Sequence, residues 1–501
     1  KNKLRTHFVR IRGDFNLDKL YDVIIIGSGV VGNAIAREMS RYNLKIGVLE
    51  KELDVCNETS ARNSGVLHAG FNNKPGTLMA KFCVEGNQGF DQVAKELGVP
   101  FKRCGKLVVG FSEEDKEKLI AMKEQGEKNG VKGLEIIGKD KIKEIEPNID
   151  GEFAMWSKTT GILNPFLLTI ALAENAATNG AEYYFGNEVI EIKRVDDIYN
   201  IKTVKDTYKT RWVVNAAGLY SDKVSKMLGI DDYTIHPCRG EYFILDEKVG
   251  SKLSLPAYPV PNPKEGGLGI HLTPTIDGNV FIGPSSEYID ERDDYSATQK
   301  IMDLLIKDGG RIFPHIRRED FIRNFAGIRP KLASKEEGGY HDFVIEMRDE
   351  APNTINLVGI ESPGLTSSTP IAKYVVSLLK QKEKLTENEN FNPIRKPIVT
   401  FVDKSIEEKE ALIKENPDYG EVICRCQTIT KAEIIEAINN PLGVETLTGI
   451  KYRCRAMMGR CQGGYCETRI AGLLEEVKHK NREDVIYSRE GSNMFVGKVR
   501  E

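Results

Sequence analysis

The sequence predicts an α/β protein built from two or three domains. Its 501 residues exceed the roughly 250–300 residues at which a single hydrophobic core stops growing, so more than one core is expected. Near the start of the sequence, a strand pattern, a glycine-rich turn, a helix pattern and a second strand pattern follow one another, which is typical of a parallel βαβ unit. Near its end, five of the nine cysteines fall within one short segment, which favours a small metal-binding module.

The composition is that of an ordinary globular protein. The hydrophobic share is 40% and the charged share 29%, which allows a large core. A net charge of -3 argues against a protein that coats nucleic acid, because the phosphate backbone requires a basic surplus. No apolar run approaches the roughly 20 residues of a membrane-spanning helix, and residues 1–18 lack the apolar stretch of a signal peptide. A soluble cytoplasmic protein is therefore expected, with its cysteines as reduced thiols or metal ligands.

The βαβ unit is predicted from three consecutive segments. Val23–Ile26 reads as a buried strand, a helical stretch follows as far as Arg41, and Lys45–Leu49 reads as the next strand. Strand and helix patterns continue to alternate, which predicts two interleaved domains. The later elements are a charged helical region over Glu113–Glu144, a helix over Gly161–Asn179, and buried strands at Trp212–Val214 and Asn356–Ile360.

A dinucleotide site is predicted between the first strand and the first helix. Gly27, Gly29 and Gly32 form a G-x-G-x-x-G there, and Glu50 ends the second strand. The glycines allow a tight turn, a close approach of the backbone to a pyrophosphate, and close packing of helix on strand, while the acid can accept ribose hydroxyls. The spacing is compatible with either NAD or FAD.

Four further segments are informative together: Thr59–Gly70 (TSARNSGVLHAG), Val214–Gly218 (VNAAG), Ala326–Pro330 (AGIRP) and Gly359–Thr366 (GIESPGLT). In this order they resemble the FAD-dependent D-amino-acid-oxidase-like superfamily, especially its glycerol-3-phosphate and L-2-hydroxyglutarate dehydrogenase branches. The resemblance extends over about residues 21–379 and implies that the nucleotide is FAD. It implies FAD-binding parts at about 21–85, 155–235 and 325–379, and substrate-domain parts at about 86–154 and 236–324.

The same resemblance assigns further contacts to the flavin. A helix is predicted to begin at Thr369 as N-cap and Pro370 as first helical residue, with its positive end facing the reduced flavin. The alternative interpretation of this segment is a plain junction between a loop and a helix. The residues implied at the FAD are Ser60, Asn63, Ser64, Ala217, Gly218, Gly364, Leu365 and Thr366.

The catalytic candidates are one arginine and two histidines. Arg329 is predicted to anchor an anionic substrate group, since a guanidinium grips carboxylate or phosphate with two donors and the resemblance places this arginine at the substrate. His271 is predicted as the base, with His68 as second candidate beside the flavin ring. The alternatives are a structural arginine paired with an acid and structural histidines. Lys331 could add a second positive charge beside Arg329.

The substrate is predicted to be a small anionic alcohol, with glycerol-3-phosphate as the first choice. Relatives acting on that substrate tend to show an Arg-Tyr pair after the His-x-Gly segment, whereas this chain has Phe71-Asn72-Asn73-Lys74, and Lys74 could replace the missing charge. An L-2-hydroxy acid such as 2-hydroxyglutarate, or an amino or imino acid, is the alternative substrate. A non-catalytic electron-transfer subunit is the alternative function.

Four cysteines have the spacing of a metal-thiolate site. Cys424 and Cys426 form a C-x-C, thirty-four residues intervene, and Cys461 and Cys466 form a C-x4-C. Four thiolates on two loops suit either zinc or an iron–sulfur cluster. The segment around the second pair resembles the bacterioferritin-associated-ferredoxin-like [2Fe-2S] domain, and that pattern leaves Cys454 outside the ligand set.

Basic side chains surround the predicted cluster. Arg453, Arg455 and Arg460 could offset the negative charge of a thiolate-bound cluster, or could simply form a solvated helix end. A cluster fused to a flavin domain implies a protein electron acceptor, such as a pyridine-nucleotide-disulfide-type flavoprotein subunit, within a hetero-oligomeric complex.

The predicted architecture is α/β, with a Rossmann-type FAD-binding domain interleaved with an α+β substrate domain and followed by a small helical [2Fe-2S] module. The predicted boundaries are an N-terminal extension over residues 1–20, the oxidoreductase over 21–379, a linker over 380–420, the cluster module over 421–479 and a tail over 480–501.

Overall fold

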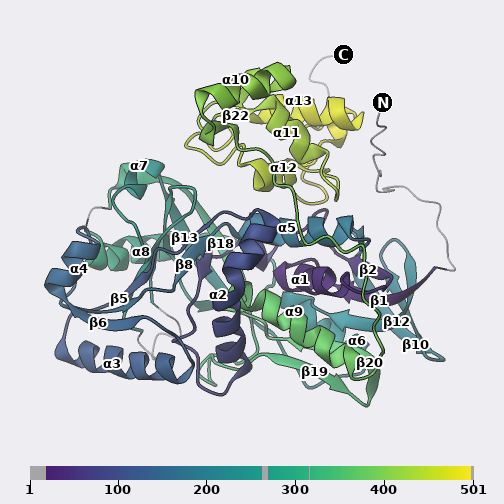
Figure 1. Ribbon diagram of the computed structural model, residues 1–501, viewed down its shortest axis with the longest axis horizontal. Coiled ribbons are helices and arrows are strands. Elements are labelled where there is room, and N and C mark those ends of the chain that lie inside the picture. Colours follow the sequence, from purple (N-terminus) through teal and green to yellow (C-terminus); the bar gives the residue numbers. More distant parts are fainter. Residues whose placement is uncertain (1–18, 262–268, 315, 498–501) are drawn as a thin grey trace.

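The computed structural model describes residues 19–261, 269–314 and 316–497. Residues 1–18 of the predicted N-terminal extension and the last four residues of the predicted tail lie outside the described residues. Within the described residues the chain forms two large β-sheets with their helices, and a separate C-terminal module (Figure 1).

An eight-stranded sheet contains the predicted βαβ unit. β1 (Leu20–Ile26) lies between β2 (Ile46–Leu49) and β12 (Thr207–Asn215) and is parallel to both, and α1 (Val30–Met39) connects β1 to β2. Both faces of β1 and β2 are covered, which explains their continuous apolar sequence. The strand–helix–strand order agrees with the prediction. The remaining strands are β9 (Glu182–Tyr184), β10 (Val189–Val195), β11 (Ile198–Thr203), β19 (Val344–Arg348) and β20 (Ala351–Val358).

Helices α1, α2 (Leu78–Leu97), α5 (Pro165–Thr178) and α9 (Gly364–Lys380) pack against one another beside this sheet. Their buried side chains form one hydrophobic core with those of β1 and β2. Removal of this apolar surface from water stabilises the packing of the four helices on the eight-stranded sheet. A three-stranded sheet of β3 (Val66–Leu67), β4 (Phe101–Lys102) and β8 (Gly161–Leu163) leads into α5.

Helix α9 begins at Gly364, six residues before the predicted first helical residue Pro370, so that prediction was wrong. Pro370 lies inside the helix and has no N–H, so the carbonyl oxygen of Thr366 lacks its usual partner four residues on. The backbone of α2 covers this oxygen, because a Cβ atom at Gly86 would lie 2.0 Å from it. This close packing accommodates the proline within the helix, which a rule based on local capping could not anticipate.

A nine-stranded sheet forms most of the second domain. The predicted helical region over Glu113–Glu144 is interrupted, because a strand lies between α3 and α4, and glycines at positive φ at 130 and 133 separate that strand from α3. The strands are β5 (Lys106–Gly110), β6 (Leu134–Gly138), β7 (Phe153–Ser157), β13 (His236–Leu245), β14 (Ala257–Pro259), β15 (His271–Pro274), β16 (Val280–Gly283), β17 (Glu287–Tyr288) and β18 (Phe321–Lys331). The helices of this domain are α3 (Glu113–Lys128), α4 (Lys139–Ile145), α7 (Glu247–Gly250) and α8 (Gln299–Ile312), whereas α6 (Ser221–Met227) packs on the eight-stranded sheet.

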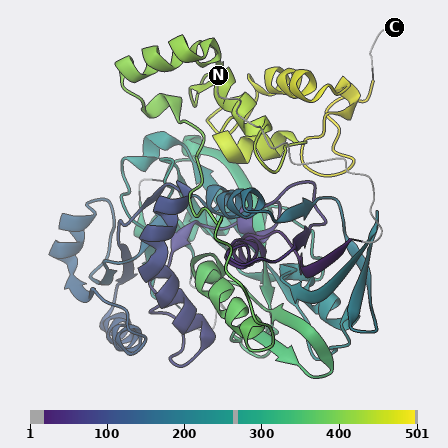
Figure 2. The same cartoon turned by 45° about the vertical axis from the view of Figure 1, so that its right-hand side comes forward.

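The C-terminal module has its own hydrophobic core and lies over α5 in both views (Figures 1 and 2). The segment predicted as a linker contains α10 (Ile406–Glu415), which begins with a capping box formed by Ser405 and Glu408. The module comprises β21 (Val422–Cys424), β22 (Ile429–Thr430), α11 (Lys431–Ile438), α12 (Leu447–Cys454) and α13 (Glu467–Lys478). Among the described residues, no helix combines the length and the apolar character needed to cross a membrane.

Candidate active site

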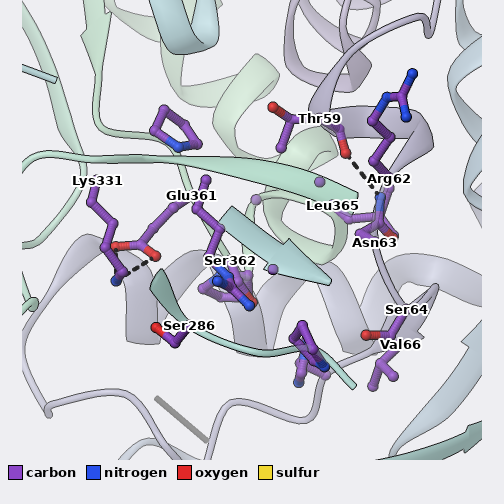
Figure 3. A pocket seen from close by; sticks show the side chains of 18 of the residues that line it. Thr59, Arg62, Asn63, Ser64, Val66, Ser286, Lys331, Glu361, Ser362 and Leu365 are labelled. Atoms are coloured by element: carbon purple, nitrogen blue, oxygen red, sulfur yellow. Dashed lines mark hydrogen bonds and ion pairs between the residues drawn. The ribbon is translucent and has the colours of Figure 1, made fainter. Parts of the chain in front are cut away.

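A cavity of about 860 Å³ is lined by residues of both large sheets and of the loops between them (Figure 3). A smaller cavity of about 160 Å³ shares residues with it and adds Gly27, Glu50 and Ala217. Gly32 and Thr366 line neither of the two cavities. The predicted site residues that line the large cavity are Gly29, Ser60, Asn63, Ser64, His68, Gly218, His271, Arg329, Gly364 and Leu365.

The predicted dinucleotide turn has the geometry that its glycines require. Gly27 has a φ of +106°, and a Cβ atom there would lie 2.5 Å from the carbonyl oxygen of Ala216. A Cβ atom at Gly32 would lie 2.0 Å from the carbonyl oxygen of Gly27, so only glycine lets α1 pack this closely on the turn. The open space beside Gly29 and the N-terminus of α1 fits a pyrophosphate group.

Glu50 lies at the end of β2 beside this turn. Its carboxylate accepts hydrogen bonds from the backbone N–H groups of Ser28 (2.7 Å) and Glu52 (2.9 Å). Burial raises the pKa of Glu50 to about 7, against the opposing effect of these two hydrogen bonds. The side chain lines the smaller cavity together with Ala217 and Gly218, which is the position a ribose would occupy.

The loop before β3 is held by its own side chains. The Ser60 hydroxyl accepts a hydrogen bond from the backbone N–H of Val30 at the start of α1 (2.9 Å). The Asn63 amide nitrogen donates to the carbonyl oxygens of Thr59 and Ser60, and its oxygen accepts from the N–H of Gly65. The loop is therefore held against the dinucleotide turn, with Asn63 and Ser64 facing the cavity (Figure 3).

Arg329 lies on β18 and faces the large cavity. Its guanidinium donates to the carbonyl oxygen of Ser285 (3.2 Å) and contacts the Sγ atom of Cys238 (3.7 Å). No carboxylate of the described residues lies within ion-pair distance of it. The guanidinium thus retains its charge for a ligand, as a substrate anchor must.

His271 lies on β15 and is only 3% exposed. Its Nδ1 atom is 3.0 Å from the carbonyl oxygen of Gly269, which can only accept, so Nδ1 donates and Nε2 carries the lone pair. Nε2 is buried and has no hydrogen-bond partner among the described residues. Burial, with repulsion from Lys106, holds the pKa of His271 well below its usual value, so the imidazole is uncharged.

His68 lies between β3 and α2 and also lines the cavity. Its backbone N–H donates to Thr366 Oγ1 (3.0 Å), and its carbonyl oxygen accepts from the amide of Asn87 (3.1 Å). Burial lowers the pKa of His68 to about 3, with a smaller contribution from Lys106. Thr366 therefore positions the His68 segment and does not itself line the cavity.

Lys331 does not provide the free positive charge that was considered for it. Its ammonium donates to Glu361 (2.9 Å) and to the carbonyl oxygen of Gly339 (2.8 Å), and Figure 3 shows the two charged side chains pointing toward one another. Both charged side chains are about 10% exposed. The charge of Lys331 is thus neutralised within the protein.

Two residues that the sequence interpretation missed lie next to His271. The ring of Tyr258 stacks on the imidazole, with ring centroids 3.6 Å apart and an interplanar angle of 11°. The ammonium of Lys106 lies 3.3 Å from the centroid of the same tyrosine ring. The available signal for Lys106 was a lysine at the start of the apolar strand KLVVG, whereas Tyr258 had none.

The four cysteines predicted as ligands lie together in the C-terminal module. The Sγ atom of Cys426 is 3.9 Å from that of Cys424 and 3.8 Å from that of Cys461, and Cys466 is hydrogen-bonded to Cys424. These contacts link the four thiols in the order Cys466, Cys424, Cys426 and Cys461. Across the described residues, no group of three or more His, Cys, Asp or Glu side chains is placed to hold a single metal ion. Four neighbouring cysteine side chains suit an iron–sulfur cluster, whose irons are bound by thiolates.

The module contacts the oxidoreductase domain through its helix α12 and its second cysteine loop. Arg453 forms two hydrogen bonds with Asp54 (2.6 and 2.9 Å), and each of these side chains is 1% exposed. Gln462, between two of the cysteines, accepts a hydrogen bond from Arg323 (2.9 Å). Because Arg323 and Arg329 share β18, one strand connects the cysteine loop with the large cavity.

The fold and the cavity define a flavin-dependent oxidoreductase. A model of the FAD-dependent oxidoreductase family matches residues 22–378, and the chain belongs to that family. A model of the BFD-like [2Fe-2S] binding domain matches residues 422–476. The protein therefore combines an FAD-binding oxidoreductase domain with a [2Fe-2S] domain, as predicted.

Three similar proteins indicate which flavin-dependent oxidoreductases this chain resembles. The chain is 41% identical to a glycerol 3-phosphate dehydrogenase of Caloramator mitchellensis, over 95% of this chain and 98% of that protein. It is 32% identical to an L-2-hydroxyglutarate dehydrogenase of Indibacter alkaliphilus, over 70% of this chain and 96% of that protein. Its structure resembles the FAD-bound L-alpha-glycerophosphate oxidase of Mycoplasma pneumoniae, with a TM-score of 0.70 and 29% identity over 75% of this chain and 98% of that one.

Proposed function

We propose that this protein is a dehydrogenase that oxidises glycerol-3-phosphate and transfers the electrons through its cluster to a separate protein. The observation that carries the proposal is the pairing, in one cavity, of Arg329 and His271, where neither the guanidinium has a carboxylate partner nor Nε2 a hydrogen-bond partner among the described residues. A cation for an anionic group and a base for a hydroxyl proton are the two groups that oxidation of such an alcohol requires.

In this proposal Arg329 holds the phosphate and so orients the alcohol carbon. His271 accepts the hydroxyl proton at Nε2 while the C–H hydrogen leaves as hydride and a carbonyl forms. FAD, bound along the Gly27–Gly32 turn, supplies the two-electron acceptor. His68 is neutral and lines the cavity, where it excludes water from the reacting groups.

Glycerol-3-phosphate is preferred to L-2-hydroxyglutarate because of how far each match extends. The match to the glycerol 3-phosphate dehydrogenase covers 95% of the chain and so includes the cluster module, whereas matches to L-2-hydroxyglutarate dehydrogenases cover 70–73%. A dicarboxylate would also need a second cation, and Lys331 is paired with Glu361 while Lys74 is exposed. Asn72 and Asn73 line the cavity and could bind the substrate by neutral hydrogen bonds.

The cluster is proposed to be held by Cys424, Cys426, Cys461 and Cys466, with Cys454 outside the ligand set. Two of these thiols, Cys426 and Cys461, are exposed, which supports electron transfer to a partner flavoprotein in a hetero-oligomeric complex. A cytoplasmic location is supported by the nine cysteines, none of which forms a disulfide.

A substrate panel under anaerobic conditions tests the proposal. Glycerol-3-phosphate, L-2-hydroxyglutarate, L-lactate and L-proline are each mixed with the FAD- and cluster-loaded protein, and the flavin and cluster absorbances are followed. Glycerol-3-phosphate should bleach the flavin first and the cluster second. Reduction by another member of the panel alone would replace the substrate, and no reduction by any member would leave only the electron-transfer role.

A further inference from the structure

Three adjacent strands of the second sheet place a lysine, a tyrosine and the proposed base in one row. Ala257 of β14 pairs with Leu272 of β15, so the neighbouring residues Tyr258 and His271 face each other across the two strands. Tyr258 pairs with Val108 of β5, and Lys106 lies two residues earlier on the same face of that strand. The register of the sheet therefore produces the contact of Lys106 with Tyr258 and of Tyr258 with His271.

Lys106 is a buried cation without a hydrogen-bonding or ionic partner among the described residues. It is 1% exposed, and its Nζ atom has no hydrogen-bond partner there. The ammonium lies over the rings of Tyr258 (3.3 Å to the centroid) and Phe71 (5.1 Å), whose faces are electron-rich. Two aromatic faces compensate only part of the lost hydration of an ammonium, so this position destabilises the folded protein.

The charge of Lys106 acts on His271 at short range. The two centroid distances place the ammonium within about 7 Å of the imidazole, in a region from which water is excluded. Among the described residues, the other titratable or charged groups near the pair are His68, Arg329 and the thiol of Cys83, and none of these three is an anion. In the described part of the chain, the contact that favours a charged imidazole is the one with the carbonyl oxygen of Gly269. An uncompensated positive field therefore surrounds the imidazole.

We propose that Lys106 is a positioning residue for the oxidation reaction, whose buried charge keeps His271 uncharged, with Nε2 free to accept the substrate proton, when an anionic substrate enters the cavity. The need arises from the substrate itself. A phosphate held by Arg329 would favour protonation of the nearby imidazole, and a protonated base could not accept the hydroxyl proton. Lys106 opposes that effect from behind Tyr258, out of contact with the substrate. This inference rests on the proposed role of His271.

The test compares Lys106→Met with the wild-type protein, both loaded with FAD and cluster. The limiting rate of flavin reduction by glycerol-3-phosphate is measured anaerobically from about pH 4.5 to about pH 8. Burial lowers the pKa of Lys106 to about 7, so the lysine is charged over the acidic part of this range. Loss of its charge should move the acid limb of the profile upward by about one to two pH units, because the Coulomb repulsion between the ammonium and a protonated imidazole is lost at this distance and an effective dielectric constant of about 20. The ionisation of the substrate is common to all variants, so only differences between variants are compared.

Thermal unfolding provides a second measurement that does not depend on activity. Lys106 binds its proton less tightly in the folded than in the unfolded protein, so its penalty is complete below about pH 7 and disappears as the pH approaches the usual lysine pKa of about 10.4. Lys106→Met should therefore raise the melting temperature by roughly 3 °C or more at pH 6 and by less at pH 9. A merely structural lysine would lower it.

Control variants separate this inference from the proposed function. Lys106→Gln is a second neutral variant in case the methionine variant fails to fold, and Lys102→Met removes an exposed lysine from neighbouring β4 and should leave the profile unchanged. Lys106→Arg, which retains the charge, should keep the acid limb of the wild type.

If His271→Asn leaves reduction unchanged, the base is wrongly assigned and this inference fails with it. If His271→Asn abolishes reduction but both neutral Lys106 variants keep the wild-type acid limb, the proposed function stands and the role of Lys106 is refuted.

Discussion

Buried cations at the interface of the C-terminal module and buried cations at the large cavity differ in their partners. At the interface, Arg453 is enclosed and its guanidinium is matched by the carboxylate of Asp54. In and behind the cavity, the partners that the described residues offer are a carbonyl oxygen and a thiol for Arg329 and aromatic rings for Lys106. Lys331 borders the same cavity, but its charge is matched by Glu361.

The difference indicates which charges serve structure and which serve chemistry. A buried ion pair with both partners present holds two elements in one relative position, although it adds little net stability. An unmatched buried charge lowers stability and persists where an incoming group will use it. By this criterion Arg453 docks the module, Lys331 fixes the loop at Glu361, and Arg329 and Lys106 belong to the reaction.

The largest expected effect is the loss of Arg453. Arg453→Met leaves the carboxylate of Asp54 buried without its cationic partner, so the free energy of unfolding should fall by about 3–5 kcal/mol. Chemical denaturation of the loaded protein measures this loss, and limited proteolysis in the segment 380–420 reports whether the module detaches. The double variant Arg453→Met with Asp54→Asn removes both charges and should recover part of the stability. A loss below about 1 kcal/mol in the single variant would show that the ion pair is not what docks the module.

Replacement of Arg329 by methionine should have the opposite result, with a small effect on stability and a large effect on activity. Arg329→Met strands no carboxylate, so the free energy of unfolding should change by no more than about 1 kcal/mol. Removal of the anchor should lower kcat/KM for glycerol-3-phosphate by about 10²–10³-fold, because a desolvated charge contact is lost. Steady-state kinetics with an artificial acceptor gives this value. Equal losses of stability and activity would mean that Arg329 is a structural residue after all.

Much of the fold could be predicted from local pattern. The strand from Val23, the glycine turn and Glu50 identified the βαβ unit because each feature has a backbone requirement that only certain residues meet. The start of α9 was mispredicted because Pro370 is accommodated by the packing of Gly86 on α2, and that contact joins residues far apart in the sequence.

The residues of the candidate site could likewise be predicted from the sequence only in part. Arg329, His271 and His68 could be found from residue type and resemblance, and the structure brings them to one cavity. Lys106 and Tyr258 could not, because their relation to His271 depends on the register of three strands, which sequence alone does not give. Arg453 was interpreted as a charge beside the cluster, whereas its partner Asp54 lies in the other domain.

The smallest effect is expected at Cys454, a buried cysteine that is predicted to lie outside the ligand set of the cluster. Its thiol donates to the carbonyl oxygen of Ile450 (3.3 Å) inside the core of the module, and burial raises its pKa to about 12, so it remains a neutral thiol. A metal ligand must be a thiolate, so Cys454→Ala should leave the cluster absorbance unchanged and lower the free energy of unfolding by about 1 kcal/mol. Cys461→Ser, its matched control at an exposed thiol, should lose the cluster while the FAD content stays constant. Loss of the cluster in Cys454→Ala at full FAD content would instead make Cys454 a ligand and remove one of the other four from the set.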